Sequence, residues 1–143
     1  MSWLTFALLT ILSYSVFDFF VKLSSDKIHT GLGGLIINVV SALVLLAFTV
    51  FAKLKGENVL EAKPGGWLYS VLAGITVGLA TIFFLKMFST GTNLSLGVPL
   101  VRIGVVVLAS ILGIILLKEG VNPKYLIGLL FSLVGLYILV TSQ

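Results

Sequence analysis

The sequence alternates between long apolar stretches and short polar segments. Five stretches are apolar over the roughly 20 residues that a helix needs to cross the hydrocarbon core of a bilayer, and they span approximately residues 3–23, 32–52, 67–88, 94–117 and 125–140. They lack the two-residue alternation of a barrel strand and are too long for one. Backbone amides must be paired inside the hydrocarbon, so each stretch is predicted to be a helix. We therefore expect an all-α, polytopic membrane protein, with residues 1–143 forming a single transmembrane domain of five helices.

Composition excludes a water-soluble fold. The 143 residues are 59% hydrophobic and only 10% charged, with a mean hydropathy of +1.22, whereas soluble domains are about 45–50% apolar and about 25% charged. The absence of cysteine excludes a disulfide framework, a thiolate nucleophile and a cysteine-based metal site. The formal net charge of +4 is spread through an apolar chain and does not form a basic nucleic-acid-binding patch. The expected partner is the lipid bilayer, and no nucleic acid is expected.

The distribution of basic residues between the loops predicts the orientation. The five lysines in the segments after the second and fourth stretches are Lys53, Lys55, Lys63, Lys118 and Lys124. The opposite side has Lys27, with Lys22 and Lys86 added only if residues at helix ends are counted. The positive-inside rule places the lysine-rich side in the cytoplasm. This predicts a cytoplasmic N-terminus and an external C-terminus, and Trp3, Trp67 and Tyr125 then form an aromatic belt at the cytoplasmic boundary.

Several ionisable and polar residues lie within the predicted spans. An ionisable group inside a span is costly and is by default a candidate for function. Six residues form the candidate substrate-binding set, all in or near the outer half of the membrane: Tyr14, Asp18, Lys22, Asn38, Lys86 and Arg102. With Asp18 ionised, the four charged members sum to +2, which favours a substrate with an anionic group. In the alternative interpretation, Lys22 and Lys86 extend to the interface and Asp18 neutralises Lys22 or Arg102 as a structural pair.

The segment around Arg102 combines residues that disturb a helix. Pro99 removes a backbone donor and favours a kink, and Gly97 and Gly104 loosen the same segment. We expect this helix to bend or partly unwind, with these three residues as a hinge, because discontinuous helices often form transporter binding sites. Small residues at helical spacing, such as Gly74 and Gly78, fit either internal helix packing or a dimer interface.

The five-stretch layout resembles one half of a protein of the drug/metabolite transporter superfamily, in its EamA-like permease group and the short five-span bacterial and archaeal branch. The most similar segments are VPLVRIGVVVLASILGIILLKEG, YLIGLLFSLVGLYIL and SYSVFDFFVK. Pro99, Arg102 and Glu119 match the family's fourth helix, and the resemblance implies an architectural role for Glu119. The four-span small multidrug-resistance relatives have a glutamate in the middle of their first helix. Here Ser13, Tyr14 and Ser15 stand at that depth.

The resemblance also implies a partner and a location. Larger family members resemble two such halves fused in opposite orientation, and inverted repeats make alternating access possible. This chain has one half, so we expect a homodimer or a dimer with an oppositely oriented partner subunit. The resemblance to the bacterial and archaeal branch implies a multi-pass protein of the prokaryotic cell (inner) membrane.

These observations predict a secondary transporter subunit that moves a small polar metabolite. In one form of this hypothesis the metabolite is anionic. Arg102 would bind the anionic group and Asp18 would act as its counter-ion or as a proton-coupled switch. Two alternatives stay open: a membrane assembly or lipid-handling factor that moves no solute, and a cation or drug–proton antiporter that uses Asp18. An enzyme is not expected, because the single histidine, His29, lies in a loop and no span holds a pair of acids. Neither a metal nor another cofactor is expected.

Overall fold

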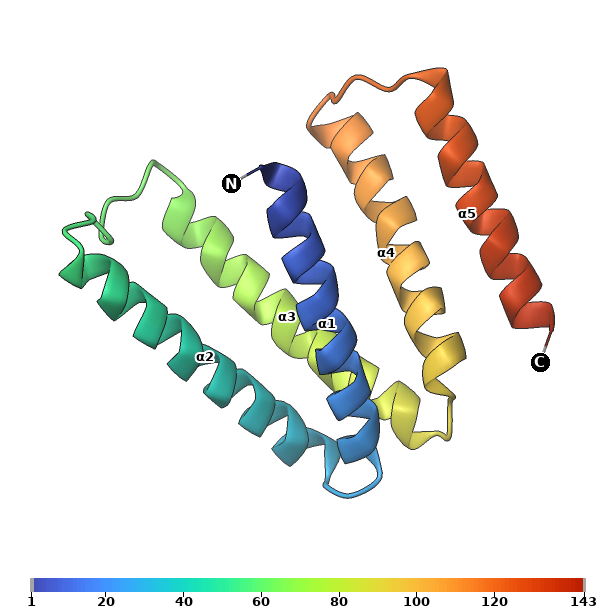
Figure 1. Cartoon of the computed structure of the whole chain (residues 1–143), viewed down its shortest axis with the longest axis horizontal. Helices are drawn as coiled ribbons and strands as arrows, with labels where there is room; N and C mark the ends of the chain where they lie inside the picture. Colours follow the sequence, from blue (N-terminus) through green and yellow to red (C-terminus); the bar gives the residue numbers. More distant parts are fainter. Residues whose placement is uncertain (1, 143) are drawn as a thin grey trace. The chain divides into compact units, whose positions relative to one another are not determined.

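The computed structural model describes residues 2–142, and regular structure in this range is entirely helical (Figure 1). The five helices are α1 (Trp3–Ser25), α2 (Thr30–Leu54), α3 (Gly66–Ser89), α4 (Leu94–Leu116) and α5 (Pro123–Thr141). Each is long and apolar enough to cross a membrane. The predicted fold class, an all-α protein with five transmembrane helices, is confirmed. The helices begin and end within two residues of the bounds expected from hydropathy, and most extend into the flanking polar segments.

Local sequence explains where several helices begin. The Ser2 hydroxyl accepts a hydrogen bond from the backbone N–H of Thr5 and caps α1. Asn122 caps α5 through a 2.8 Å hydrogen bond from the N–H of Tyr125 to its side-chain oxygen. Pro123 follows at the first helical position, where its missing N–H removes no intrahelical hydrogen bond. These caps pair amide groups that would otherwise be unsatisfied near the membrane.

The chain divides into two compact units, which are described separately. The first extends to Gly91 and holds α1, α2 and α3. Helices α1 and α3 run in the same direction and α2 runs opposite to both (Figure 1). The most buried apolar side chains lie near the ends of α1 and α3, where Val21, Leu85 and Phe88 are at most 2% exposed.

Two glycines of α2 lie against this packed end. Gly33 and Gly34, near the start of α2, are both buried. A Cβ atom built on Gly34 would lie 3.7 Å from Cδ1 of Leu85 and 3.8 Å from Cγ2 of Thr81. The same atom on Gly33 would lie 3.1 Å from Cγ2 of Ile28. A methyl group at Gly34 would thus make ordinary van der Waals contact with α3, whereas Gly33 leaves room for Ile28, which precedes α2.

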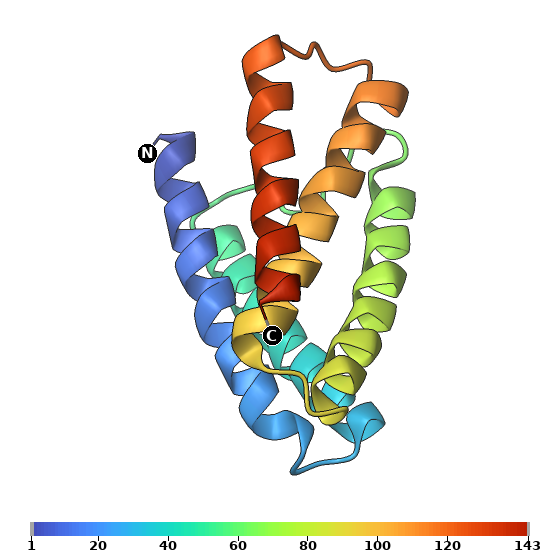
Figure 2. The same cartoon turned by 90° about the vertical axis from the view of Figure 1, so that its right-hand side faces the viewer.

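The second unit, from Thr92 onward, is a helical hairpin of α4 and α5. The two helices are antiparallel and are joined by the segment that contains Glu119 (Figure 2). The hydroxyl groups of Ser110 on α4 and Tyr125 on α5 are hydrogen-bonded to each other. Most large apolar side chains of both units are exposed, including Phe48 at 68% and Phe131 at 72%. Such a surface is unsuited to water and is typical of helices that face lipid.

Glu119 folds back onto the end of α4. Its backbone N–H donates to the carbonyl oxygen of Gly113 at 3.1 Å, and Leu117 donates to the same oxygen at 3.2 Å. A Cβ atom on Gly113 would lie only 2.5 Å from Oε2 of Glu119. Gly113 is therefore the residue that leaves room for the carboxylate. This placement agrees with the architectural role that the resemblance implies for Glu119.

Candidate functional site

Three helices of the first unit line an open cavity of about 480 Å³, called here the α1–α3 cavity. Its lining combines aromatic and aliphatic side chains with hydroxyl groups and one amide. Helix α1 contributes Phe6, Leu9, Thr10, Ser13, Tyr14 and Phe17; α2 contributes Ile37, Asn38 and Ser41; α3 contributes Val77 and Thr81. Binding sites for small molecules have this character, with an apolar wall and a few polar groups that orient the ligand. The α1–α3 cavity is therefore the candidate substrate site of this unit.

The hydroxyl groups in the cavity are held by their own helices. Thr10 and Ser13 each donate a 2.8 Å hydrogen bond to the carbonyl oxygen four residues earlier on α1. Ser41 on α2 and Thr81 on α3 do the same, also at 2.8 Å. Such bonds satisfy the hydroxyl hydrogens within the helix and fix the rotamers of these side chains.

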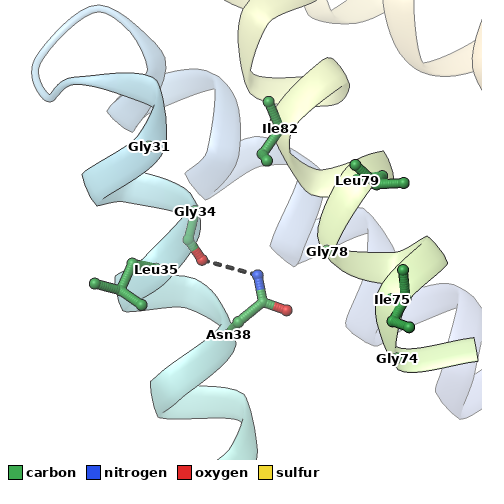
Figure 3. Close-up of a pocket in the computed structure, with 9 residues that line it drawn as sticks. All are labelled: Gly31, Gly34, Leu35, Asn38, Gly74, Ile75, Gly78, Leu79 and Ile82. Atoms are coloured by element: carbon green, nitrogen blue, oxygen red, sulfur yellow. Dashed lines mark hydrogen bonds between the residues drawn. The ribbon is translucent and has the colours of Figure 1, made fainter. Parts of the chain in front are cut away.

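Asn38 is the polar residue shared by two hollows of the first unit. Its side-chain nitrogen donates to the carbonyl oxygen of Gly34 at 2.8 Å. Figure 3 shows the amide lying between α2 and α3, with its oxygen directed away from that bond. Asn38 lines both the α1–α3 cavity and a second groove of about 530 Å³ between α2 and α3. The prediction from sequence thus singled out a residue that faces open space within the bundle.

The groove between α2 and α3 exists because glycines face it. Gly31 and Gly34 line it from α2, and Gly74 and Gly78 line it from α3 (Figure 3). A Cβ atom on Gly74 or Gly78 would have no heavy atom within 4 Å outside its own helical backbone. These two glycines therefore widen a groove. Their spacing does not bring α3 into close contact with a neighbouring helix of the first unit.

Asp18 is one helical turn from Tyr14 on α1 and is only 3% exposed. It lies close to the packed end of the first unit, where Val21 and Ser25 of the same helix are also buried. The neighbouring Tyr14 and Phe17 rings meet edge to face with centroids 6.1 Å apart. A carboxyl group is therefore buried next to the aromatic part of the α1–α3 cavity.

The two lysines of the candidate set have different surroundings. Lys22, in the last turn of α1, directs its ammonium group to Phe88 on α3, 3.5 Å from the carbonyl oxygen and 5.5 Å from the centre of the ring. Lys86, in the last turn of α3, is exposed and does not line the α1–α3 cavity. Tyr14 and Asn38 are thus the two members of the set that the cavity brings together, and Asp18 lies beside them. Substrate binding by Lys22 and Lys86 stays a prediction.

The remaining predicted residues belong to the second unit. Arg102 lies on α4 and is partly buried. Gly97 is buried in the first turns of the same helix, and Gly104 has open space where a side chain would be. The chain is helical without interruption from Leu94 to Leu116, through Pro99, so the partial unwinding expected there is absent from this helix. The roles of Arg102 as an anion clamp and of Pro99 as a hinge stay predictions.

Four polar cavity residues were not in the predicted set: Thr10, Ser13, Ser41 and Thr81. Helical spacing could have found two of them, because Thr10 is four residues before Tyr14 and Ser41 is three residues after Asn38. Ser13 is the immediate neighbour of Tyr14, and adjacent residues do not share a helix face. Thr81 has no such neighbour in the set, and only the packing of α3 against α1 and α2 places it in the cavity. Among residues 2–142, no group of three or more His, Asp or Glu side chains could hold a metal ion.

A comparison with protein families gives a match over almost the whole chain. The family model described as "EamA-like transporter family" matches residues 1–141. No curated protein and no solved structure matches the chain. The family match covers both structural units and all five helices.

Proposed function

Since this chain belongs to the EamA-like transporter family, we propose that it is a subunit of a secondary transporter that moves a small polar metabolite by alternating access. The family makes it a membrane transporter of the drug/metabolite type. The observation that carries the finer proposal is the α1–α3 cavity. A hollow of about 480 Å³ with several polar groups on its wall fits a small solute.

A partner of opposite orientation is part of the proposal. Five spans correspond to one half of the fused layout that larger family members resemble, and alternating access by exchange of conformations needs two inverted halves. The partner is a second copy inserted the other way or a different subunit. We place the chain in the inner membrane of a prokaryotic cell, with its N-terminus in the cytoplasm. The lysine distribution and the exposed Trp3 and Trp67 at the starts of α1 and α3 support this orientation.

The first experiment identifies a solute. Purified protein is screened by thermal shift against amino acids, organic anions, sugars and quaternary amines, and each stabilising compound is then tested for uptake into proteoliposomes. We expect at least one compound to raise the melting temperature, because a ligand that binds only the folded state stabilises it. The same compound should be taken up in a proton- or sodium-dependent manner. If no compound of any class is bound or transported, the assembly-factor hypothesis replaces the transporter.

A second experiment tests the dimer. Because the sequence has no cysteine, single cysteines can be added without background. Asp26→Cys marks the α1–α2 loop and Glu57→Cys marks the α2–α3 loop, and both positions are exposed. Disulfide crosslinks between an Asp26→Cys copy and a Glu57→Cys copy would identify an antiparallel homodimer. Crosslinks only between like loops would overturn the opposite orientation.

A further inference from the structure

The polar groups of the α1–α3 cavity share one property that bears on the chemistry of the ligand. We propose that this cavity binds the protonated amino group of the substrate. The proposal rests on the transporter function above and deepens it by naming the chemical group that the cavity selects. It concerns only the first unit and is independent of whether Arg102 binds an anion.

The hydroxyl groups of the cavity can only accept hydrogen bonds from a ligand, unless they first break the hydrogen bond that each donates to its own helix. A hydroxyl has one hydrogen to donate and two lone pairs that accept. Thr10, Ser13, Ser41 and Thr81 each donate that hydrogen to a carbonyl oxygen of their own helix at 2.8 Å. Four hydroxyl oxygens on three different helices therefore offer lone pairs to whatever occupies the cavity.

The amide of Asn38 adds a further acceptor. One of its N–H groups is used in the 2.8 Å bond to Gly34. Its oxygen and its second N–H remain for a ligand, so this residue contributes one acceptor and one donor. Across these four hydroxyl groups and the amide, acceptors outnumber donors.

An ammonium group is the chemical complement of such a lining. It carries three donors and no acceptor, so every polar hydrogen finds an oxygen and no lone pair faces another lone pair. A carboxylate or phosphate has acceptors only, and it would bring lone pairs against lone pairs in a medium of low dielectric constant. A neutral hydroxyl matches less well, because each donor that it supplies comes with two lone pairs.

The aromatic neighbours favour the same charge. Phe6, Tyr14 and Phe17 line the cavity, and the faces of aromatic rings attract cations. The ammonium group of Lys22 is directed to the Phe88 carbonyl oxygen at 3.5 Å, and Lys22 does not line the cavity.

The test compares three probes of the same size and different charge: benzylamine, benzyl alcohol and benzoate. Each is titrated into the full-length protein in nanodiscs, and binding is measured by ligand-observed NMR with empty nanodiscs subtracted. We expect benzylamine to bind, benzyl alcohol to bind about tenfold more weakly or not at all, and benzoate not to bind, since hydrogen bonds that involve a charged group are roughly twice as strong as neutral ones. Equal binding of benzylamine and benzyl alcohol, or preferential binding of benzoate, would overturn the proposal.

Matched variants place the binding in this cavity. Ser13→Ala, Ser41→Ala and Thr81→Val each remove one cavity acceptor, and each should weaken benzylamine binding by about tenfold. Their controls are Ser15→Ala, Thr49→Val and Thr76→Val, which remove hydroxyls that also donate to carbonyl oxygens of their own helices, three or four residues earlier, but do not line the cavity. The controls should bind benzylamine like the wild type. Equal losses in both sets would contradict the assignment.

The inference and the transporter function fail in different ways. Benzylamine binding that responds to the three cavity variants, in a protein that takes up no solute, would leave the ammonium site standing and refute transport. Uptake of a solute by a protein that does not bind benzylamine would support transport and refute the ammonium site. Because the three variants lie on three helices, a variant that does not fold removes only one of three independent measurements, and the probe comparison in the wild type stands without any of them.

Discussion

The ammonium nitrogen of Lys22 lies 3.5 Å from the carbonyl oxygen of Phe88 and 5.5 Å from the centre of the Phe88 ring. Phe88 is fully buried in the last turn of α3, and Lys22 is in the last turn of α1. A cation near the carbonyl groups at the C-terminal end of a helix interacts favourably with the helix dipole. The contact therefore joins the ends of two parallel helices, and it gives Lys22 a structural role in this conformation.

We expect Lys22→Met to lower the stability of the protein. Methionine preserves the length of the side chain but removes the hydrogen bond and the cation–π contact, which together contribute about 1–2 kcal/mol. The melting temperature in detergent should fall, and Lys22→Arg should restore most of it. Lys86→Met is the matched control, because Lys86 occupies the last turn of α3 but is exposed. An unchanged melting temperature together with lost solute uptake would show instead that Lys22 serves the substrate.

A second prediction concerns Gly113 and the carboxylate of Glu119. In Gly113→Ala the new methyl group would lie 2.5 Å from Oε2 of Glu119, so the carboxylate must move. Because this oxygen is the end of an exposed, flexible side chain, it can swing away, and we expect only a small loss, less than about 1 kcal/mol in the free energy of unfolding, read as a slightly lower melting temperature. Gly128→Ala is the control, because a Cβ atom there meets nothing within 4 Å. Adding Glu119→Ala to Gly113→Ala should remove the clash, so the double variant should lose less stability than the sum of the losses in the two single variants. A loss equal to that sum or larger would contradict this explanation.

The fold was predictable because lipid imposes a simple rule on the sequence. A spanning segment must be long, apolar and internally hydrogen-bonded, and the five helices follow that rule closely. Their ends were less predictable, because caps such as that of Asn122 extend a helix into polar sequence. Hydropathy therefore finds a span well but locates its ends to within a few residues.

The candidate site was predictable only in part, for a physical reason. Asp18 and Asn38 are costly groups within a span, so the sequence marks them, and the structure places them in or beside the α1–α3 cavity. Thr81 gives no such signal, because a threonine that donates to its own helix costs little in lipid. Lys22 lies at the depth of the predicted substrate residues, but its neighbour is set by how α1 and α3 pack, which the sequence does not give.

The orientation can be checked by labelling. Asp26→Cys and Glu57→Cys lie at exposed positions in the loops at the two opposite ends of α2. In intact cells, if the partner is a different subunit, a membrane-impermeant maleimide should label Asp26→Cys strongly and Glu57→Cys weakly, because the lysine-rich side is retained in the cytoplasm. An antiparallel homodimer predicts similar labelling of both positions instead, because half of its copies are inverted. Labelling after permeabilisation serves as the reference for both positions. The ratio of the two signals gives the share of inverted molecules, and stronger labelling of Glu57→Cys would show that the predicted orientation is wrong.

Arg102 provides the sharpest test of the predicted anion clamp. An arginine is effectively always charged and forms paired hydrogen bonds with a carboxylate or phosphate, whereas lysine supplies only a point charge. If Arg102 binds an anionic group of the substrate, Arg102→Gln should raise KM by about tenfold or more, and Arg102→Lys should have a smaller effect. Uptake of the compound found in the thermal-shift screen, measured in proteoliposomes with equal amounts of reconstituted protein, gives KM and the maximal rate. A structural role predicts a different pattern, in which Arg102→Gln lowers the melting temperature of the ligand-free protein and leaves the KM of the surviving protein unchanged.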